Sequence, residues 1–478
     1  MTGAAKAISW SGLKRRAFSL GAVKTFDHAM HFLLPVVLTR SLDAATYGEY
    51  RLLWLVVGTL MTVATLNMAG GLFYFVPRSD ARGKRLYIHQ TMLFLGASGL
   101  VCAALAAPWN PLLPAALAPL ERHGALVPAF IALWVAAVLL DWLPTIDERI
   151  RWQAYATGAS SLLRVVLVAG AAWLTGELRP VLWMLLAFVV LKLALLVFYV
   201  HRKHGLRGPW FERTAFSAQF RHCAPLGLSN ALYALRGQSD QWVAASLFAL
   251  SSFAAFSIAA LVGQVVHIVR HSVMEAFMPT MSRMHATGDV RGVMALNSRA
   301  NVMVGTALYP LLAFAFAFAE DLVRVVFTAT YVEAAPVMRV YIVGMLAMVV
   351  EVGSIVLLLR QGAFALRITA FALAVSVALS WSAAQGLGLA GAAAGSVVAV
   401  YLDRTLLLRR IARLTGIALP ELQQWGALLR TLAAAAVAGL LAWFLVRQLL
   451  ADAAPLARVA AGATILALAY VPLWRVSK

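Results

Sequence analysis

The sequence predicts an all-α polytopic membrane protein with about 14 transmembrane helices. Of its 478 residues, 62% are hydrophobic and only 13% are charged, against about a quarter charged in soluble domains. The mean hydropathy of +0.81 means more apolar surface than soluble cores of normal size could bury. Because one membrane helix takes about 20 residues, the chain has no room for a large soluble domain.

Apolar segments of spanning length follow one another along the whole chain. The predicted spans are Leu20 to Thr39, Leu52 to Phe75, Tyr87 to Ala107, Val127 to Thr145, Gln153 to Thr175, Pro180 to Val200, Pro225 to Leu247, Phe253 to Met278, Val302 to Phe318, Val337 to Leu359, Ile368 to Gln385, Leu389 to Leu408, Leu429 to Val446 and Val459 to Leu473. The longest inner loop, His201 to Arg221, predicts a lobe boundary. We therefore expect helices one to six in residues 1–205, helices seven to twelve in 206–415 and the last two in 416–478.

The net charge of +20 would suggest a nucleic-acid partner for a soluble protein, but in a polytopic chain it follows from the positive-inside rule. With the amino terminus inside, the inner segments hold 26 lysines and arginines and the outer loops hold seven. This asymmetry predicts that both termini are cytoplasmic, and we expect no bound nucleic acid.

Motifs for catalysis or nucleotide binding are missing from the sequence. It has no Gly-x-x-x-x-Gly-Lys-Ser/Thr loop, no His-Glu-x-x-His, no Cys-x-x-Cys and no Gly-x-Ser-x-Gly, so we expect no ATPase, no bound metal, no cofactor and no enzyme activity. Cys102 and Cys223 form no disulfide framework. The short outer loops also disfavour a membrane glycan polymerase or acyltransferase, which needs a large catalytic surface outside the membrane.

Seven basic residues lie inside predicted spans, where each costs about 2.5 to 3.5 kcal/mol at a helix centre. They are Lys24, Arg164, Lys192, Arg236, Arg270, Arg339 and Arg404. At the helical rise, Arg164 and Arg236 lie about 16 Å from the inner face, and Lys192 and Arg270 about 12 Å. Arg339 and Arg404 are near span ends and are interpreted as interfacial.

Local neutralisation is one explanation of these charges. Lys24 with Asp27, Arg236 with Asp240, and His271 with Glu275 are spaced so that their side chains can meet on one helix face. Arg164, Lys192 and Arg270 have no acid three or four residues away. Their charge needs a water-filled cavity, an acid on another helix such as Glu351, or a ligand.

A binding site is the other explanation, because basic stripes on spans one and eight, with Arg236, predict a cationic chamber between the lobes for phosphate, pyrophosphate or carboxylate. The predicted substrate-binding residues are Lys24, His28, His31, Arg164, Lys192, Arg236, His267, Arg270 and His271. The candidate ion-coupling residues are Asp27, Asp240, Glu275 and Glu351.

Three segments resemble a known family. Pro35 to Leu42 followed by Ala45 to Tyr50 resembles the connection between the first two helices of polysaccharide flippases. Ala319 to Ala335 resembles their outer connection between helices nine and ten, and Gly386 to Ala394 their glycine turn before helix 12. The chain is identified by this resemblance as a Wzx-type O-antigen or exopolysaccharide flippase of the multidrug/oligosaccharidyl-lipid/polysaccharide exporter (MOP) superfamily.

The resemblance implies two six-helix lobes in a V shape and a cavity lined by helices one, two, seven and eight. It also implies transport of undecaprenyl-pyrophosphate-linked glycans across a bacterial inner membrane by alternating access. A polysaccharide polymerase and chain-length machinery would be its protein partners, and an ion gradient its energy source. The alternatives are a peptidoglycan-precursor flippase, which shares 14 helices and a cationic cavity, and a multidrug antiporter of the same superfamily. Such antiporters usually have 12 helices and acidic cavities.

Overall fold

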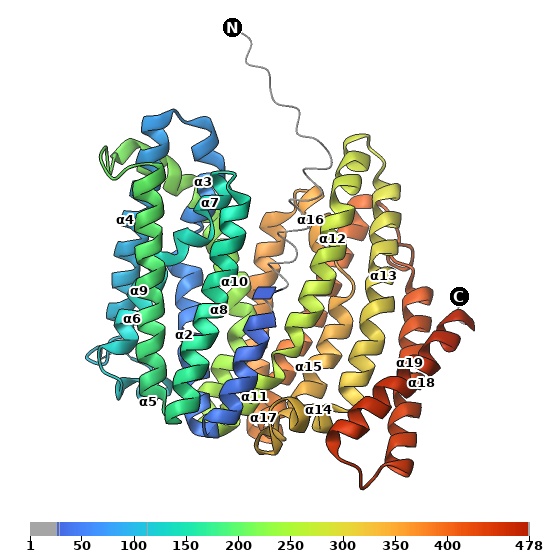
Figure 1. Cartoon of the computed structure of the whole chain (residues 1–478). Helices are drawn as coiled ribbons and strands as arrows, with labels where there is room; N and C mark the ends of the chain where they lie inside the picture. Colours follow the sequence, from blue (N-terminus) through green and yellow to red (C-terminus); the bar gives the residue numbers. More distant parts are fainter. Residues whose placement is uncertain (1–25, 28, 112, 477–478) are drawn as a thin grey trace. The chain divides into compact units, whose positions relative to one another are not determined.

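The computed structural model describes residues 26–27, 29–111 and 113–476. Over these residues, helices are the only regular secondary structure (Figure 1), so the predicted all-helical class is confirmed. The chain divides into two compact units, Met1–Ala231 and Leu232–Lys478. The lobe limits at residues 205 and 415 were defined by membrane helices rather than by compactness, and they stay predictions.

The first unit is a bundle of long helices. Residues 29–41 are helical, and the elements that follow are α2 (Ala44–Ala64), α3 (Met68–Phe75), η1 (Val76–Arg78), α4 (Ala81–Leu105), η2 (Ala115–Leu117), α5 (Ala118–Glu121), α6 (Leu126–Ala137), η3 (Val138–Asp141), α7 (Leu143–Ile146), α8 (Ile150–Thr175), α9 (Leu178–Lys203) and the first part of α10 (Arg213–Leu247). Helix α6 packs against α4 and α9, and α8 packs against α9. These contacts place α8, α9 and η3 around one pocket.

A buried carboxylate ties α2 to the loop before α6. Glu49 is fully buried; it accepts hydrogen bonds from Nε of Arg122 at 2.9 Å and from Nε2 of His123 at 2.8 Å. Burial lowers the pKa of His123, and the charges of Arg122 and Arg179 lower it further. A neutral imidazole still donates one N–H, so the contact with Glu49 does not require a protonated histidine.

A second carboxylate, that of Asp147, connects the loop before α8 to the end of α9. One carboxylate oxygen of Asp147 accepts the hydroxyl of Tyr199 and Nε2 of His204, each at 2.8 Å. Burial raises the pKa of Asp147, but the hydrogen bond and charge of His204 and the hydroxyl of Tyr199 outweigh it, so the net shift is downward. The carboxylate thus stays ionised near neutral pH and fixes the loop before α8.

The second unit is also helical. It contains the rest of α10, then α11 (Leu250–Ala259), α12 (Val262–Ala286), α13 (Val290–Ala317), α14 (Ala319–Val326), η4 (Ala329–Tyr331), α15 (Ala334–Met348), α16 (Gly353–Leu358), α17 (Gly362–Thr415), η5 (Leu419–Glu421), α18 (Trp425–Leu449) and α19 (Pro455–Val476). Helix α13 packs against α12 and α18, α15 packs against α17, and α18 packs against α19. The final helix pair therefore belongs to this compact unit.

Helix α10 starts at Arg213, before the predicted seventh span at Pro225. Its first turns are polar yet partly buried. Gln219 is fully buried; it accepts a hydrogen bond from Gln90 at 2.6 Å and donates one to Thr91 at 2.9 Å. Because α4 supplies the partners, this polar segment is helical without the apolar pattern that would have predicted it.

The predicted tenth span is broken at Glu351. Helix α15 ends at Met348 and α16 begins at Gly353. The carboxylate of Glu351 accepts the backbone N–H groups of Gly353 at 2.6 Å and Ser354 at 3.2 Å. Its own backbone N–H donates to the side chain of Asn301 at 3.1 Å. Side-chain hydrogen bonds thus stabilise the break by satisfying backbone groups that a continuous helix would pair internally.

Helix α17 is a hairpin that contains predicted spans eleven and twelve. Gly388 has φ 61° and ψ −144°, a conformation that favours glycine, and the chain reverses there. A Cβ at Gly391 would collide with the carbonyl oxygen of Ala383, and one at Gly395 with the backbone of Ser380. The two arms therefore approach at the distance that small residues allow.

Ten described helices are long and apolar enough to cross a membrane. One of them, Gly362–Thr415, contains two predicted spans. The three predicted spans outside this set are the first, whose start lies outside the described residues, the polar α10, and the broken pair α15 and α16. A multi-pass membrane protein is supported, and the count of fourteen stays a prediction.

Candidate functional site

Each unit contains a polar pocket among its helices. In the first unit, a cavity of about 430 Å³ lies between residues of helix 29–41, η3, α8 and α9. Its charged lining residues are Asp27, Asp141, Arg164 and Lys192, and His31 lies beside them. Of the predicted substrate-binding residues, the structure brings His31, Arg164 and Lys192 to this one pocket. Lys24 and His28, also predicted for the site, lie outside the described residues.

His31 links Asp27 to Arg164. Its Nδ1 lies 2.9 Å from the main-chain oxygen of Asp27 and 3.4 Å from the Asp27 carboxylate, so this nitrogen donates a proton. Its Nε2 lies 2.9 Å from Nη2 of Arg164. Because a guanidinium only donates, Nε2 is the acceptor. The imidazole thus connects the Asp27 turn to the guanidinium of Arg164.

Arg164 is only partly satisfied by this contact. The residue is 7% exposed, and its Nε, like the side-chain oxygen of Gln153 in the lining of the same cavity, is buried without a hydrogen-bond partner in the described structure. Asp27, the nearest acid of the cluster, accepts a hydrogen bond from the hydroxyl of Ser161. Buried polar atoms without partners are rare in proteins, and in a pocket they are groups that a bound polar ligand would satisfy.

The charge of Lys192 is compensated by an acid on another helix, which is one of the three possibilities that the sequence left open. Its Nζ lies 2.8 Å from the carboxylate of Asp141 at the end of η3 and 5.1 Å from the ring centre of Trp134. The lysine side chain is 10% exposed and that of Asp141 is 50% exposed. The pair therefore presents its carboxylate to the more open side.

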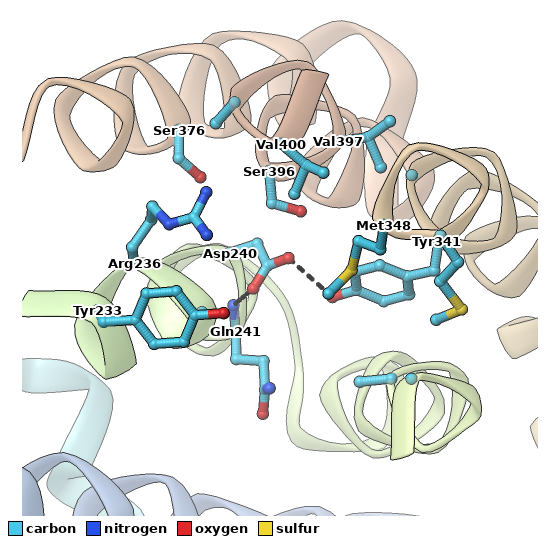
Figure 2. A pocket seen from close by; sticks show the side chains of 16 residues that line it. Tyr233, Arg236, Asp240, Gln241, Tyr341, Met348, Ser376, Ser396, Val397 and Val400 are labelled. Atoms are coloured by element: carbon cyan, nitrogen blue, oxygen red, sulfur yellow. Dashed lines mark hydrogen bonds between the residues drawn. The ribbon is translucent and has the colours of Figure 1, made fainter. Parts of the chain in front are cut away.

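The pocket of the second unit contains Asp240 and Arg236 together (Figure 2). It encloses about 240 Å³ between residues of α10, α12, α15 and α17 and Ala260, which follows α11. Asp240 is 3% exposed; its carboxylate accepts the hydroxyl of Tyr341 at 2.9 Å and the N–H of Gln241 at 2.8 Å. The hydroxyl of Ser396 on α17 also hydrogen-bonds to it. The carboxylate is thus held by neutral donors.

The predicted pairing of Arg236 with Asp240 does not form an ion pair in the described structure. The guanidinium of Arg236 lies instead 5.3 Å from the ring centre of Tyr233, and its Nε is buried without a hydrogen-bond partner. Figure 2 shows Arg236 pointing toward Ser376. One pocket thus holds a cation and an anion that do not neutralise each other directly.

The other predicted residues of this unit lie outside that pocket. On α12, His271 contacts Glu275 at 3.0 Å, as their spacing predicted, and both side chains are more than half exposed. The ring of His267 lies 5.7 Å from that of His271, and Arg270 is half-buried on the same helix. Glu351 caps α16. The structure therefore distributes the predicted ion-coupling residues over several places.

Sequence reasoning missed Asp141, Ser161 and Tyr341, which line the two pockets. Asp141 holds Lys192 and Ser161 holds Asp27 in the first unit, and Tyr341 holds Asp240 in the second. Arg404, interpreted as interfacial, is 9% exposed and has a buried Nε without a hydrogen-bond partner. Asp141 could have been predicted as a site residue, because an acid inside an apolar span is as costly as a base. The sequence pattern gives no such indication for Ser161 and Tyr341.

Comparison with protein-family models shows the family of the chain. A family model described as "Polysaccharide biosynthesis protein" matches residues 13–285, which is more than half of the sequence. The chain belongs to this polysaccharide biosynthesis family. A search of curated protein sequences finds no significant match.

Solved structures show the fold. The chain resembles the lipid II flippase MurJ in an inward closed conformation, with a TM-score of 0.69, 11% identity and coverage of 95% of this chain and 98% of that one. It also resembles an inward-facing MATE family multidrug resistance transporter of the MOP superfamily, with a TM-score of 0.59, 12% identity and coverage of 81% and 95%.

A third match is a MOP superfamily transporter from Pyrococcus furiosus, described as having a binding pocket of reverse polarity (TM-score 0.53, 13% identity, coverage 84% and 96%). At these identities the three matches establish the fold alone. This member of the polysaccharide biosynthesis family thus has a fold similar to that of these flippases and transporters. The matched proteins are flippases and transporters rather than enzymes.

Proposed function

We propose that the protein flips undecaprenyl-pyrophosphate-linked oligosaccharides across the bacterial inner membrane by alternating access, for the synthesis of a surface polysaccharide. The family match to polysaccharide biosynthesis supports the glycan, and the transporter fold supports movement across the membrane. The observation that carries the proposal is the buried, partly unsatisfied Arg164 in the pocket of the first unit. A buried arginine surrounded by hydroxyl and amide groups is chemistry that recognises a phosphate and a sugar together.

In this proposal the groups of the first pocket divide the work. Arg164 and Lys192 contact the anionic pyrophosphate or an acidic sugar, and Lys192 leaves Asp141 to do so. Gln153, Thr157 and Ser160, which line the same cavity, hydrogen-bond to sugar hydroxyl groups. The polyprenyl chain stays in lipid, where its hydrocarbon costs nothing to accommodate. Lys24 and His28, which lie outside the described residues, stay predicted substrate contacts.

The second pocket supplies ion coupling in this proposal. Asp240 is buried and held by neutral donors, and an unpaired carboxylate inside a membrane protein is expensive unless it takes up a proton or a cation. A proton is the ion that fits best, because it needs no shell of oxygen ligands and the groups at the carboxylate already donate hydrogen bonds to it. Asp27, Glu275 and Glu351 have partners of their own and are weaker candidates.

The alternatives fit less well. A multidrug antiporter for cationic drugs needs an acidic pocket, whereas each pocket here holds a buried or half-buried arginine. A peptidoglycan-precursor flippase would use the same chemistry, because its substrate also carries a pyrophosphate. The similarity to MurJ supports the common fold and does not favour that substrate.

Leaflet-resolved analysis of the lipid-linked sugars tests the proposal. A deletion strain should accumulate complete oligosaccharide-lipid on the inner leaflet, because assembly precedes transport, and a plasmid copy should restore it to the outer leaflet. Loss of a polymerase would instead leave single units outside, loss of a drug antiporter would change dye susceptibility alone, and loss of a peptidoglycan flippase would trap the peptidoglycan precursor. Normal outer-leaflet levels in a strain that also lacks any second flippase contradict the proposal.

The orientation of the chain is part of the proposal and has its own prediction. The inner loop at Arg207 is expected to be cytoplasmic and Thr330 in η4 to face the other side; both residues are exposed. Single cysteines at these positions, in a chain whose buried Cys102 and Cys223 are replaced by alanine, should react with a membrane-impermeant maleimide only at 330. Reaction at 207 and not at 330 inverts the orientation, and permeabilised cells should label both.

A further inference from the structure

A third pocket lies apart from the two described above, at one end of the helices in the second unit. It encloses about 710 Å³ between the end of α13, α14, α15, the last turn of α18 and the first turn of α19. These helix ends coincide with the ends of predicted membrane spans, so the pocket lies at the level of lipid headgroups. The proposed transport assigns no role to it.

Two ion pairs hold this pocket open. Arg458 on α19 contacts Asp321 on α14 through Nη2 at 2.5 Å and Nε at 3.1 Å, and Arg339 on α15 contacts Glu320 on α14 at 3.1 Å. Both nitrogens of Arg458 donate to one carboxylate oxygen of Asp321, and together with the contact of Arg339 they fix α14 between its neighbours. Both acids of the pocket are therefore already neutralised.

Two further arginines of the lining have no acid partner. Arg324, in the last turn of α14, and Arg447, in the last turn of α18, are exposed and form no ion pair within the described residues. The guanidinium of Arg447 lies 4.9 Å from the ring centre of Trp443. Tryptophan is enriched at membrane interfaces. The pocket thus carries two uncompensated positive charges beside an interfacial aromatic ring.

Apolar side chains next to the pocket favour a lipid over a soluble anion as its ligand. Leu449, two residues after Arg447, is 74% exposed, and Leu456, two residues before Arg458, is 64% exposed. Exposed leucines beside a basic pocket at headgroup level provide a surface for acyl or polyprenyl chains. We propose that this pocket binds the phosphate group of an anionic lipid, with Arg324 and Arg447 as its ligands.

Native mass spectrometry of the purified full chain tests this with three probes: phosphatidylglycerol, undecaprenyl pyrophosphate and inorganic pyrophosphate. The double variant R324Q/R447Q should bind the lipid probes about thirtyfold more weakly, because each arginine beside an anionic headgroup contributes about a factor of five. Arg430→Gln is the matched control, since Arg430 is exposed at the opposite end of α18 and bonds only to its own helix. It should bind as the wild type does. R324K/R447K, which keeps both charges, should retain most of the binding.

The outcomes separate the sources and decide the proposal. Arginine-dependent binding of phosphatidylglycerol identifies a phospholipid site, and arginine-dependent binding of undecaprenyl pyrophosphate alone identifies a site for the substrate lipid; both support a lipid phosphate. Equal binding of both lipids by the wild type and R324Q/R447Q overturns it, as does inorganic pyrophosphate binding as tightly as the lipids. If R324Q/R447Q does not fold, weak lipid binding by R324K/R447K at full thermal stability overturns it too. Since transport is not measured, failure of the proposed function would leave these results unaffected.

Discussion

Arg164→Ala is expected to abolish glycan export while the protein stays inserted and abundant. The substitution removes a buried charge from a membrane helix, which makes insertion easier. It also removes the donor that a phosphate or acidic sugar would bind in the first pocket. Because a hydrogen bond to a charged group contributes about 1.5 to 3 kcal/mol, affinity for the lipid-linked pyrophosphate should fall by about 10- to 150-fold. Binding to purified protein and surface polysaccharide in cells measure the two effects.

Matched variants separate binding from stability. Arg151→Ala lies in the first turn of the same helix, where the side chain is exposed, and should leave export unchanged. Arg164→Lys keeps the charge and should retain part of the affinity. Normal export by Arg164→Ala at wild-type protein level would refute the binding role. Loss of the protein in both Arg164 variants would assign the residue to folding.

Much of the fold could be predicted because membrane spans are long and apolar, and their signal does not depend on tertiary contacts. The two departures arise from contacts between distant residues. Helix α10 begins early because Gln90 and Thr91 on α4 satisfy Gln219, and the tenth span breaks because Asn301 on α13 holds the backbone at Glu351. Neither partner lies within the window that a hydropathy pattern reads.

The sequence predicted some charged residues of the candidate site but not the groups that contact them. Depth identified Arg164 and Lys192, since a charge far from both faces needs compensation wherever the helix packs. The identity of the partner depends on packing: Asp141 compensates the charge of the lysine, whereas the arginine contacts a hydrogen-bond acceptor, His31, which carries no negative charge. Spacing along one helix misled at Arg236 and Asp240, because Tyr341 and Ser396 from other helices hold the carboxylate.

Asp240→Asn is expected to remove the response to an ion gradient while leaving the protein folded. Asparagine has nearly the same shape; its carbonyl oxygen can accept the N–H of Gln241 while its NH2 group donates to the hydroxyl oxygen of Tyr341, so the pocket should persist. It cannot take up a proton or bind a cation by charge. Tyr341→Phe, which keeps the carboxylate, should keep the gradient response, and Glu421→Gln, at an exposed acid in η5, should behave as the wild type.

Proteoliposomes with an imposed membrane potential or pH gradient measure this response. One charge moved across 100 mV supplies about 2.3 kcal/mol, so the wild type should enrich the substrate in one leaflet by up to about fiftyfold, and Asp240→Asn should reach equal leaflets at any gradient. Exchange between leaflets without a gradient should continue in the variant, since the first pocket is unchanged. Enrichment by Asp240→Asn equal to that of the wild type would show that Asp240 does not carry the ion, and would direct the search to Asp27, whose carboxylate already contacts His31.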